Sequence, residues 1–400
     1  MEHALREQWA NPSSIHRPGQ MARQQIELAR KHLGALIGAR PRQLTLCGSG
    51  TEAIDLAIRG FLLASGRIGA RRAREPGAIL TSKVEHAAVR ELAAALEKEE
   101  GVRVLWADLG ADGVVDVASV RRLLDANPDT ALVSVQWANN ETGAVQPVRE
   151  IGELCVQHRA AFHCDATQWV GKMPTSVDVG SADAGGATGT FRLVCDLLTF
   201  SPHKFHGPKG VGVLWGRPGV RTAPLIHGEQ ELGRRGGTEN VPGIIGAGVA
   251  AQIAAEWLFD PERRRAVGAL RDRFERGVLE GYPDATVNGP RENAEEQGTR
   301  RLWNTTNIAF PRLEAEALLL LLSERGVCAS AGAACSSGSL DPSPVLLAMG
   351  VGPERAHGSL RFSLSKFTTR EEVDEAVGVV VASAKRLHES MEGVGRDNRR

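Results

Sequence analysis

The sequence lacks an excess of charge of either sign. Its 400 residues contain 48 Lys and Arg against 48 Asp and Glu, so the formal net charge is zero. Surfaces that bind nucleic acid or other polyanions are normally basic, so we expect no direct nucleic-acid binding. We find no apolar stretch long enough to cross a bilayer, and the first residues lack the apolar core of a secretion signal. These absences predict a cytoplasmic protein that does not enter membranes.

The six cysteines lack the spacing of a redox pair or of a zinc site. None forms a C-x-x-C motif, and they stand at positions 47, 155, 164, 195, 328 and 335. The run His163-Cys164-Asp165 contains metal-binding residue types, but neighbouring strand residues point to opposite faces and cannot share one ion. We therefore predict no metal site, and we expect most of these thiols to be buried in a reducing compartment.

One cysteine, Cys335, has unusual surroundings. The residues from Ala329 to Ser339 are almost all Ala, Ser and Gly, which give a loop little to pack with. We therefore expect an exposed, mobile loop, in which a thiol is reactive. The alternative is an idle thiol at this position. The other five cysteines are interpreted as structural.

Strand-like and helix-like patterns alternate through the first part of the chain. This alternation predicts an α/β fold with a mostly parallel, doubly wound sheet. Near Tyr282 the pattern changes to that of a smaller α+β unit. We place the two domains at residues 1–258 and 259–400, and the second contains Cys335. The apolar runs interpreted as strands of the first domain are 44–47, 78–81, 102–106, 131–136, 161–164 and 197–200.

Polar residues follow several of these strands directly. They come from well-separated parts of the chain and are Glu85-His86, Asn139-Asn140-Glu141, Asp165 with Gln168, and Ser201, His203 and Lys204. In doubly wound sheets ligands bind beyond the carboxyl ends of the strands, so the topology should bring these groups to one edge. The sequence therefore predicts a ligand site at that edge.

A glycine-rich turn from Gly48 to Glu52 joins the strand at 44–47 to a helix. The N-terminus of a helix presents free N–H groups and a partial positive charge, so this turn is a candidate anion site. It is not a Walker loop, because no Gly-Lys-Ser/Thr ending is present. The alternative is an ordinary helix start with Thr51 as its cap.

Lys204 stands just after the apolar run 197–200 and a Ser-Pro turn. Burial disfavours the charged ammonium, and a neutral amine can form a Schiff base with a carbonyl cofactor. Pyridoxal phosphate requires a carboxylate for its ring nitrogen, a donor for its ring oxygen, a phosphate cradle and a stacking ring. Asp165 fits the carboxylate and Gln168 the donor. The phosphate cradle is matched by Gly50, Thr51, Ser201 and His203, and the stacking ring by His86. A substrate carboxylate is best matched by Arg361.

Each of these residues has a simpler interpretation when it is taken alone. Lys204 could merely end a strand, and Asp165 could cap a helix. His86 could lie on the surface, and Arg361 could pair with any carboxylate. The hypothesis of a cofactor site therefore depends on their occurrence together.

Several motifs together resemble the cysteine desulfurase family of the NifS/IscS type, in its group I form with a long cysteine loop. This family belongs to the class V aminotransferase-like, fold-type I pyridoxal-phosphate enzymes. The motifs follow the family's order and span nearly the whole chain. They are Asn11-Pro12-Ser13-Ser14-Ile15-His16, Gly48-Ser49-Gly50-Thr51-Glu52-Ala53, Glu85-His86, Ala138-Asn139-Asn140-Glu141-Thr142-Gly143, His163-Cys164-Asp165-Ala166-Thr167-Gln168, residues 201–210, Arg235-Gly236-Gly237-Thr238-Glu239-Asn240, Ala333-Ala334-Cys335-Ser336-Ser337-Gly338 and Leu360-Arg361-Phe362-Ser363.

The resemblance implies a seven-stranded, mostly parallel sheet flanked by helices, and a homodimer. It implies conversion of L-cysteine to L-alanine, with the sulfur held on Cys335 as a persulfide. The sulfur then passes to an acceptor or scaffold protein for iron–sulfur cluster assembly or thiolation. By this resemblance, Lys204 attaches the cofactor covalently, Asp165 pairs with its ring nitrogen, and Gln168 contacts its ring oxygen. His86 is implied to stack on the ring and assist proton transfer, while the phosphate is implied to be held by Gly50, Thr51, Ser201 and His203. Thr238 is implied to reach the phosphate of the neighbouring subunit, and Asn140 and Arg361 to bind the substrate carboxylate, with Asn140 also beside the cofactor.

The sequence departs from the family in two places. The family's usual first strand, with a Leu-Asp-x-Asn-Ala-Thr-Thr stretch, is expected to be absent, so the N-terminal segment is interpreted as shortened. Residues 181–195 are interpreted as an insertion of unassigned function. Two alternatives therefore stay open: another class V activity, such as an aminotransferase or β-lyase, and a catalytically weak sulfur-carrier scaffold.

Overall fold

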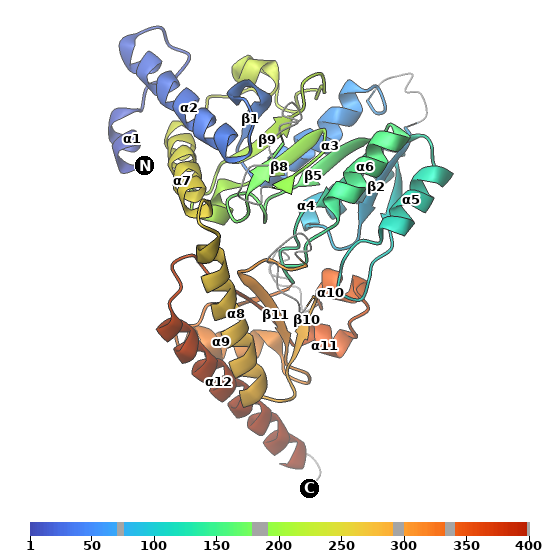
Figure 1. Cartoon of the computed structure of the whole chain (residues 1–400), viewed down its shortest axis with the longest axis vertical. Coiled ribbons are helices and arrows are strands. Elements are labelled where there is room, and N and C mark those ends of the chain that lie inside the picture. The colour runs from blue at the N-terminus through green and yellow to red at the C-terminus, as the bar shows by residue number, and fades with distance from the viewer. Residues whose placement is uncertain (70–75, 178–190, 291–299, 333–340, 398–400) are drawn as a thin grey trace. The chain divides into compact units, whose positions relative to one another are not determined.

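The computed structural model describes residues 1–69, 76–177, 191–290, 300–332 and 341–397 (Figure 1). Cys335 and residues 181–190 of the predicted insertion lie outside this described part. The chain folds into two compact units. The first unit comprises residues 1–108, 116–137 and 147–260, and the second comprises residues 109–115, 138–146 and 261–400.

The first unit is built on a seven-stranded sheet with the order β1-β9-β8-β5-β4-β2-β3. Its strands are β1 (Leu44–Cys47), β2 (Ala78–Ser82), β3 (Arg103–Ala107), β4 (Thr130–Gln136), β5 (Ala161–Asp165), β8 (Leu197–Phe200) and β9 (Gly212–Gly216). Only β9 runs antiparallel to its neighbours, β1 and β8. The predicted mostly parallel, seven-stranded sheet is confirmed. A short parallel pair, β6 (Thr175–Ser176) and β7 (Phe191–Arg192), lies outside this sheet.

The inner strands of this sheet form because most of their residues are apolar and buried on both faces. Every residue of β2 and of β8 is buried, as expected for parallel strands covered by helices on both sides. The helices of the unit are α1 (Glu2–Glu7), α2 (Arg17–Leu36), α3 (Gly50–Ala64), α4 (Ala87–Glu100), α5 (Val117–Ala126), α6 (Val148–His158) and α7 (Val241–Leu258). The sequence patterns predicted neither α1 nor β9.

Helix α7 is long and apolar enough to cross a membrane by length and composition alone. The statement that the sequence holds no such stretch is therefore wrong. Half of the helix is buried in the unit, however, and it packs against α2. Gly248 lets this packing come close, because a Cβ there would lie 2.6 Å from the Cβ of Ala29. Core helices of globular proteins also meet this criterion of length and composition, and α7 packs as such a core helix does.

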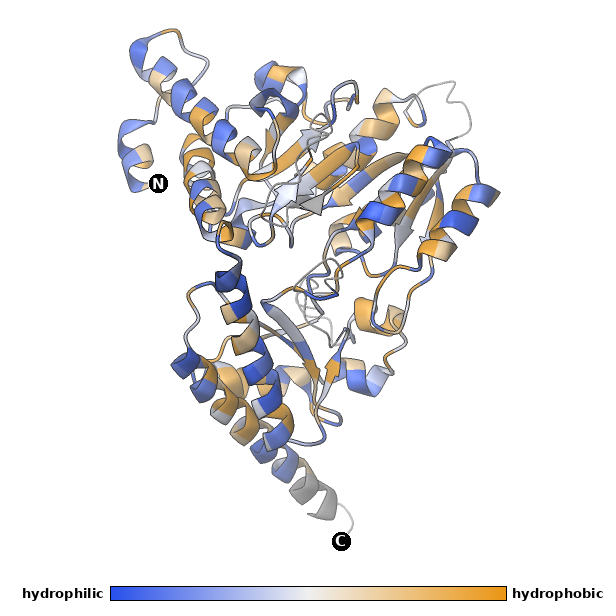
Figure 2. Cartoon of the chain, viewed as in Figure 1, coloured by the Kyte–Doolittle hydropathy of each residue, from blue (hydrophilic) through white to orange (hydrophobic). Residues whose placement is uncertain are grey.

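The second unit has a four-stranded antiparallel sheet with the order β10-β11-β13-β12. Its strands are β10 (Thr286–Asn288), β11 (Thr305–Ala309), β12 (Ser330–Ala331) and β13 (Ser359–Ser363). Its helices are α8 (Pro261–Gly281), α9 (Ala315–Ser323), α10 (Pro344–Ala348), α11 (Pro353–His357) and α12 (Arg370–Asp397). Hydrophobic and hydrophilic residues of α12 lie on separate stripes (Figure 2), because one side of this helix packs against α8.

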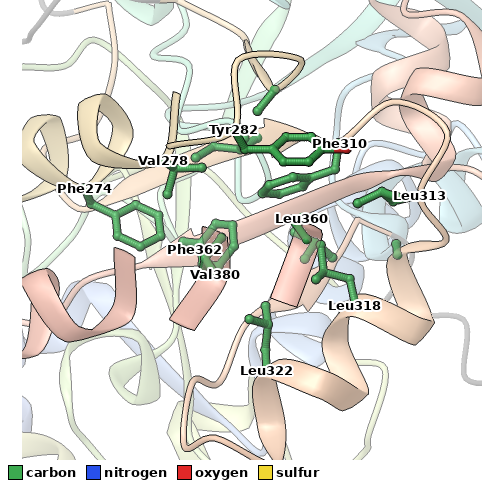
Figure 3. Close-up of a cluster of buried hydrophobic side chains, with 14 of the residues drawn as sticks. Phe274, Val278, Tyr282, Phe310, Leu313, Leu318, Leu322, Leu360, Phe362 and Val380 are labelled. Atoms are coloured by element: carbon green, nitrogen blue, oxygen red, sulfur yellow. The ribbon is translucent and has the colours of Figure 1, made fainter. Parts of the chain in front are cut away.

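The core of the second unit joins both its sheet and its helices. The side chains of Phe274, Phe310, Leu322, Leu360 and Phe362 are buried in one cluster (Figure 3). The rings of Phe274 and Phe362 lie 4.9 Å apart in a tilted arrangement that aromatic pairs prefer. This core fixes β13, which carries Arg361.

Candidate active site

The carboxyl ends of three neighbouring strands meet at one edge of the first unit's sheet. In the register of the sheet, Asp165 at the end of β5 pairs with Gln136 of β4 on one side and with Thr199 of β8 on the other. Ser201 follows β8 directly, and His86 follows β2 after a short turn. The prediction that strand ends bring these polar residues together is confirmed for the first unit.

Asp165 is a buried carboxylate that is held in a fixed direction. Its Oδ1 accepts a 3.0 Å hydrogen bond from the Thr167 amide. Burial raises the pKa of Asp165, while hydrogen bonding by Thr167 and the positive charges of His86 and Lys204 oppose this increase. Asp165 is followed by turns and not by a helix, so its interpretation as a helix cap is wrong. A carboxylate of this kind is suited to pair with a protonated ring nitrogen.

His86 is half-buried at the N-terminus of α4, so the interpretation as a surface histidine is wrong. Its Nδ1 accepts a 3.1 Å hydrogen bond from the Ala88 amide, which places the proton of the neutral ring on Nε2. Burial lowers the pKa of His86, and the charge of Lys204 lowers it further against the opposing effect of Asp165. His86 is therefore favoured in its neutral form.

Glu85 is a functional candidate to which the sequence analysis gave no role. Its side chain is fully buried, and its two oxygens lie 2.7 Å from Ser82 Oγ and 2.8 Å from the Gln136 amide. Burial raises the pKa of Glu85 to about 8, and the nearby charge of Asp165 adds to this increase. The signal in the sequence was an acidic residue just after the buried strand β2.

Lys204 lies in the short 3₁₀ turn Pro202–Phe205, and its amide donates to the Ser201 carbonyl oxygen at 3.1 Å. The side chain is exposed. The expectation that burial makes its amine neutral is therefore wrong. Its charge lowers the pKa of His86, of His203 and of Asp165, so its ammonium belongs to the same electrostatic cluster.

The turn before α3 lies against Ser201 and forms a candidate phosphate cradle. A Cβ added to Gly50 would lie 2.2 Å from Ser201 Oγ, so only glycine allows this approach. The helix cap is Ser49, whose Oγ accepts from the Glu52 amide at 3.0 Å, and not Thr51. Thr51 is exposed in the first turn of the helix. The helix N-terminus and the Ser201 hydroxyl together suit a phosphate group.

The loop that carries Thr238 is attached to the same turn. Arg235 Nε lies 2.6 Å from Glu52 Oε1, and the Gly48 amide donates to Glu52 Oε2 at 2.7 Å. Thr238 itself is exposed. Glu52 therefore joins the phosphate turn to this loop, a role that sequence reasoning missed.

Gln168 is half-buried one turn after Asp165. Its Oε1 accepts a 2.6 Å hydrogen bond from the Lys172 ammonium. Lys172 is itself buried, with 8% of its surface exposed. The two residues belong to a series of tight turns between β5 and β6.

Asn140 and Arg361 belong to the second unit and contact each other there. Arg361 Nη1 donates a 2.9 Å hydrogen bond to the backbone oxygen of Asn140. The side-chain Oδ1 of Asn140 is buried and has no hydrogen-bond partner among the described residues. Among the described residues, no carboxylate forms an ion pair with Arg361. The two side chains can therefore both serve a ligand.

The thiols divide into two groups by burial. Cys47, Cys155, Cys164 and Cys195 are buried, as expected for structural thiols. Burial raises the pKa of all four thiols, which makes them poor nucleophiles. Cys328 is exposed, so its interpretation as a structural thiol is wrong.

This fold and the cluster at the sheet edge define the class of fold-type I pyridoxal-phosphate enzymes. Residues 1–376 match the Aminotransferase class-V family. The chain is 42% identical to Cysteine desulfurase 2 of Trichormus variabilis, over 96% of this chain and 88% of that protein. The chain therefore belongs to the aminotransferase class V family and, within it, to the cysteine desulfurases, which are pyridoxal-phosphate enzymes.

Solved structures support the same assignment. A structure of a NifS-like protein matches with a TM-score of 0.82 and 33% identity, over 96% of this chain and 94% of that one. A structure of SspA in complex with cysteine matches with a TM-score of 0.73 and 30% identity, over 92% and 94% of the two chains.

Proposed function

We propose that this protein removes sulfur from L-cysteine, leaves L-alanine, and carries the sulfur as a persulfide on Cys335. The balanced reaction converts the Cys335 thiol and L-cysteine into a Cys335 persulfide and L-alanine. The observation that carries the proposal is the electrostatic cluster of Asp165, His86 and Lys204 at one sheet edge. Bound pyridoxal phosphate supplies an electron sink for the carbon that carries the amino group.

The residues of the first unit would bind and orient this cofactor. Lys204 would attach it covalently, and Asp165 would keep the ring nitrogen protonated. His86, with its proton on Nε2, would stack on the ring and move protons together with Lys204. The helix N-terminus at Gly50 and Thr51 would hold the phosphate, together with Ser201 and His203. The fit of these groups is supported by the clash that any Cβ at Gly50 would cause.

Arg361 and Asn140 of the second unit would bind the substrate carboxylate. A guanidinium presents two parallel N–H donors that match a carboxylate, and Asn140 adds a polar side chain beside it. The hydrogen bond from Arg361 to the Asn140 backbone supports their action as one group. The contact of SspA with cysteine supports the same class of substrate.

A second copy of this chain is the partner that we propose. The first unit exposes large apolar side chains, among them Trp9 (77%), Ile15 (91%) and Leu232 (75%). Apolar side chains at this exposure favour a protein interface. Thr238, on its clamped loop, would then reach the phosphate of the neighbouring copy. A sulfur-acceptor protein and a cytoplasmic location, which suits the free thiols, complete the proposal.

The decisive experiment is incubation of the purified protein with L-cysteine and measurement of alanine and sulfide. We expect alanine in proportion to sulfur, with a reductant to release the persulfide. Cys335→Ser should stop turnover while the visible absorbance of the bound cofactor stays. Cys328→Ser is the matched control and should leave turnover intact. Equal turnover by Cys335→Ser and the unchanged protein would exclude the persulfide mechanism, and absence of alanine would exclude the activity.

A further inference from the structure

Lys172 is a buried cation whose ammonium contacts the side-chain amide of Gln168. Its Nζ lies 2.6 Å from Gln168 Oε1, and 8% of its surface is exposed. Burial of an ammonium costs free energy, so a lysine that is kept inside the fold is normally held by fixed polar contacts. The contact with Gln168 is one such polar contact.

The contact determines which way the Gln168 amide faces. An ammonium has only donors, so the atom that it contacts must be the amide oxygen. The two ends of a glutamine amide are otherwise nearly interchangeable in shape, and only the hydrogen-bond network distinguishes them. The Gln168 Nε2, with its two N–H donors, is consequently directed away from Lys172.

Lys172 is itself held against the turn that carries Lys204. Its amide donates to the Trp169 carbonyl oxygen at 3.0 Å, within the turns that follow Asp165. The preceding Gly171 has φ of 78°, a region that favours glycine. A Cβ at Gly171 would lie 2.4 Å from the ring of Phe205, the residue next to Lys204. Backbone and ring packing thus fix the base of Lys172 relative to the candidate cofactor site.

We propose that Lys172 is a positioning residue, whose ammonium holds the Gln168 amide so that Nε2 donates to the ring oxygen of pyridoxal phosphate. This inference rests on the proposed function, in which Gln168 meets that oxygen. Without Lys172 the amide can rotate and present its own oxygen, which repels an anionic ring oxygen. Lys172 thereby sets the charge that the ring oxygen can carry.

The pH titration of the cofactor's visible absorbance tests this role. The ring oxygen carries its full negative charge only after the nitrogen of the Lys204 linkage has lost its proton. A donor on the oxygen therefore lowers the pKa of that nitrogen. Lys172→Met should raise the titration midpoint by about one pH unit, the worth of one hydrogen bond to a charged group. Lys172→Arg should restore it toward the unchanged protein.

A double-mutant comparison separates positioning from a direct effect of the Lys172 charge. Gln168→Met should raise the midpoint at least as much as Lys172→Met, and the double variant should match Gln168→Met alone. A larger shift in the double variant would overturn the inference, because Lys172 would then act without Gln168. Lys98→Met, which removes an exposed lysine at the end of α4, is the charge control and should leave the midpoint unchanged.

The outcomes for this inference and for the proposed function are distinct. A visible band that titrates normally but does not move in Lys172→Met overturns the role of Lys172 alone. Absence of any visible band in the unchanged protein overturns the cofactor site itself. If Lys172→Met does not fold, Lys172→Ala removes the ammonium donor with a smaller side chain. A raised midpoint in that variant supports the role, and an unchanged one overturns it.

Discussion

The two units position their candidate functional groups by different physical means. In the first unit, Asp165 and Ser201 stand at the ends of adjacent parallel strands, so the hydrogen bonds of the sheet align them. In the second unit, Arg361 contacts the backbone of Asn140 from a position 221 residues away in the chain. Here a side chain reaching between segments determines the geometry.

This difference affects what a substitution should do. The sheet edge of the first unit is held by buried backbone, so a single side chain there can be changed with little movement of its neighbours. The groups of the second unit depend on a few polar contacts, such as that of Glu141 with Ser343. Changes in the first unit should therefore alter chemistry, while changes in the second should alter substrate binding and stability.

The largest effect is expected at Lys204. Lys204→Ala should remove the visible absorbance of the bound cofactor and lower kcat by about 100- to 10,000-fold, because both attachment and proton transfer are lost. Absorbance spectra and alanine assays measure this. Lys209→Ala, an exposed lysine of the same segment, is the control and should retain the band. Persistence of the band in Lys204→Ala would contradict the assignment.

Sequence reasoning succeeded where chemistry follows a buried strand. Asp165, His86 and Ser201 could be predicted to converge because each follows an apolar run in an alternating pattern. The exposure of Lys204 could not, since a strand end does not determine the direction of the next side chain. Strand β9 begins and ends with glycine, which weakens the pattern of a strand.

The second unit was harder to predict from sequence. Asn140 follows β4 closely in the chain, yet residues 138–146 fold with the second unit. The contact that joins Asn140 to Arg361 involves a backbone oxygen, for which no residue type gives a signal. The pairing of these residues in one site came from the family resemblance alone.

The next effect is a pH dependence at Glu85 in the first unit. Its pKa is raised from 4.5 to about 8 in the folded protein, so the folded state binds a proton that the unfolded state has lost between these values. The free energy of unfolding should therefore fall with rising pH in this window, by up to about 1.4 kcal/mol per pH unit. The stability that Glu85 contributes by binding this proton is complete below pH 4.5 and is lost as the pH rises through 8.

Glu85→Gln should remove this dependence. An amide is always neutral, and it can donate to Ser82 Oγ while its oxygen accepts from the Gln136 amide, as a protonated carboxyl group does. Denaturant unfolding at pH 5 and pH 8 measures the difference. The variant should lose less stability than the unchanged protein between these two pH values. Parallel losses in the two proteins would show that Glu85 is ionised throughout.

A smaller effect is expected at Arg361 of the second unit. Arg361→Lys keeps the charge but loses the planar pair of donors, so kcat/KM for L-cysteine should fall about 10- to 100-fold. The visible band of the cofactor should stay, because Arg361 does not belong to the first unit. Arg312→Lys, on an exposed arginine that pairs with Asp284, is the control. Loss of the band in Arg361→Lys would contradict the assignment of the cofactor groups to the first unit alone.

The smallest effect is expected at Ser343, which makes two hydrogen bonds in the second unit. Its Oγ donates to Glu141 Oε2 at 2.6 Å and accepts from the Leu346 amide at 3.2 Å, as the cap of α10. Ser343→Ala removes both and should lower the free energy of unfolding by about 1 to 2 kcal/mol. Denaturant unfolding measures this, with exposed Ser323→Ala as the control. Because the proposed cofactor groups belong to the first unit, the visible band should be unchanged in Ser343→Ala. A shifted band would contradict the assignment of the cofactor groups to the first unit alone.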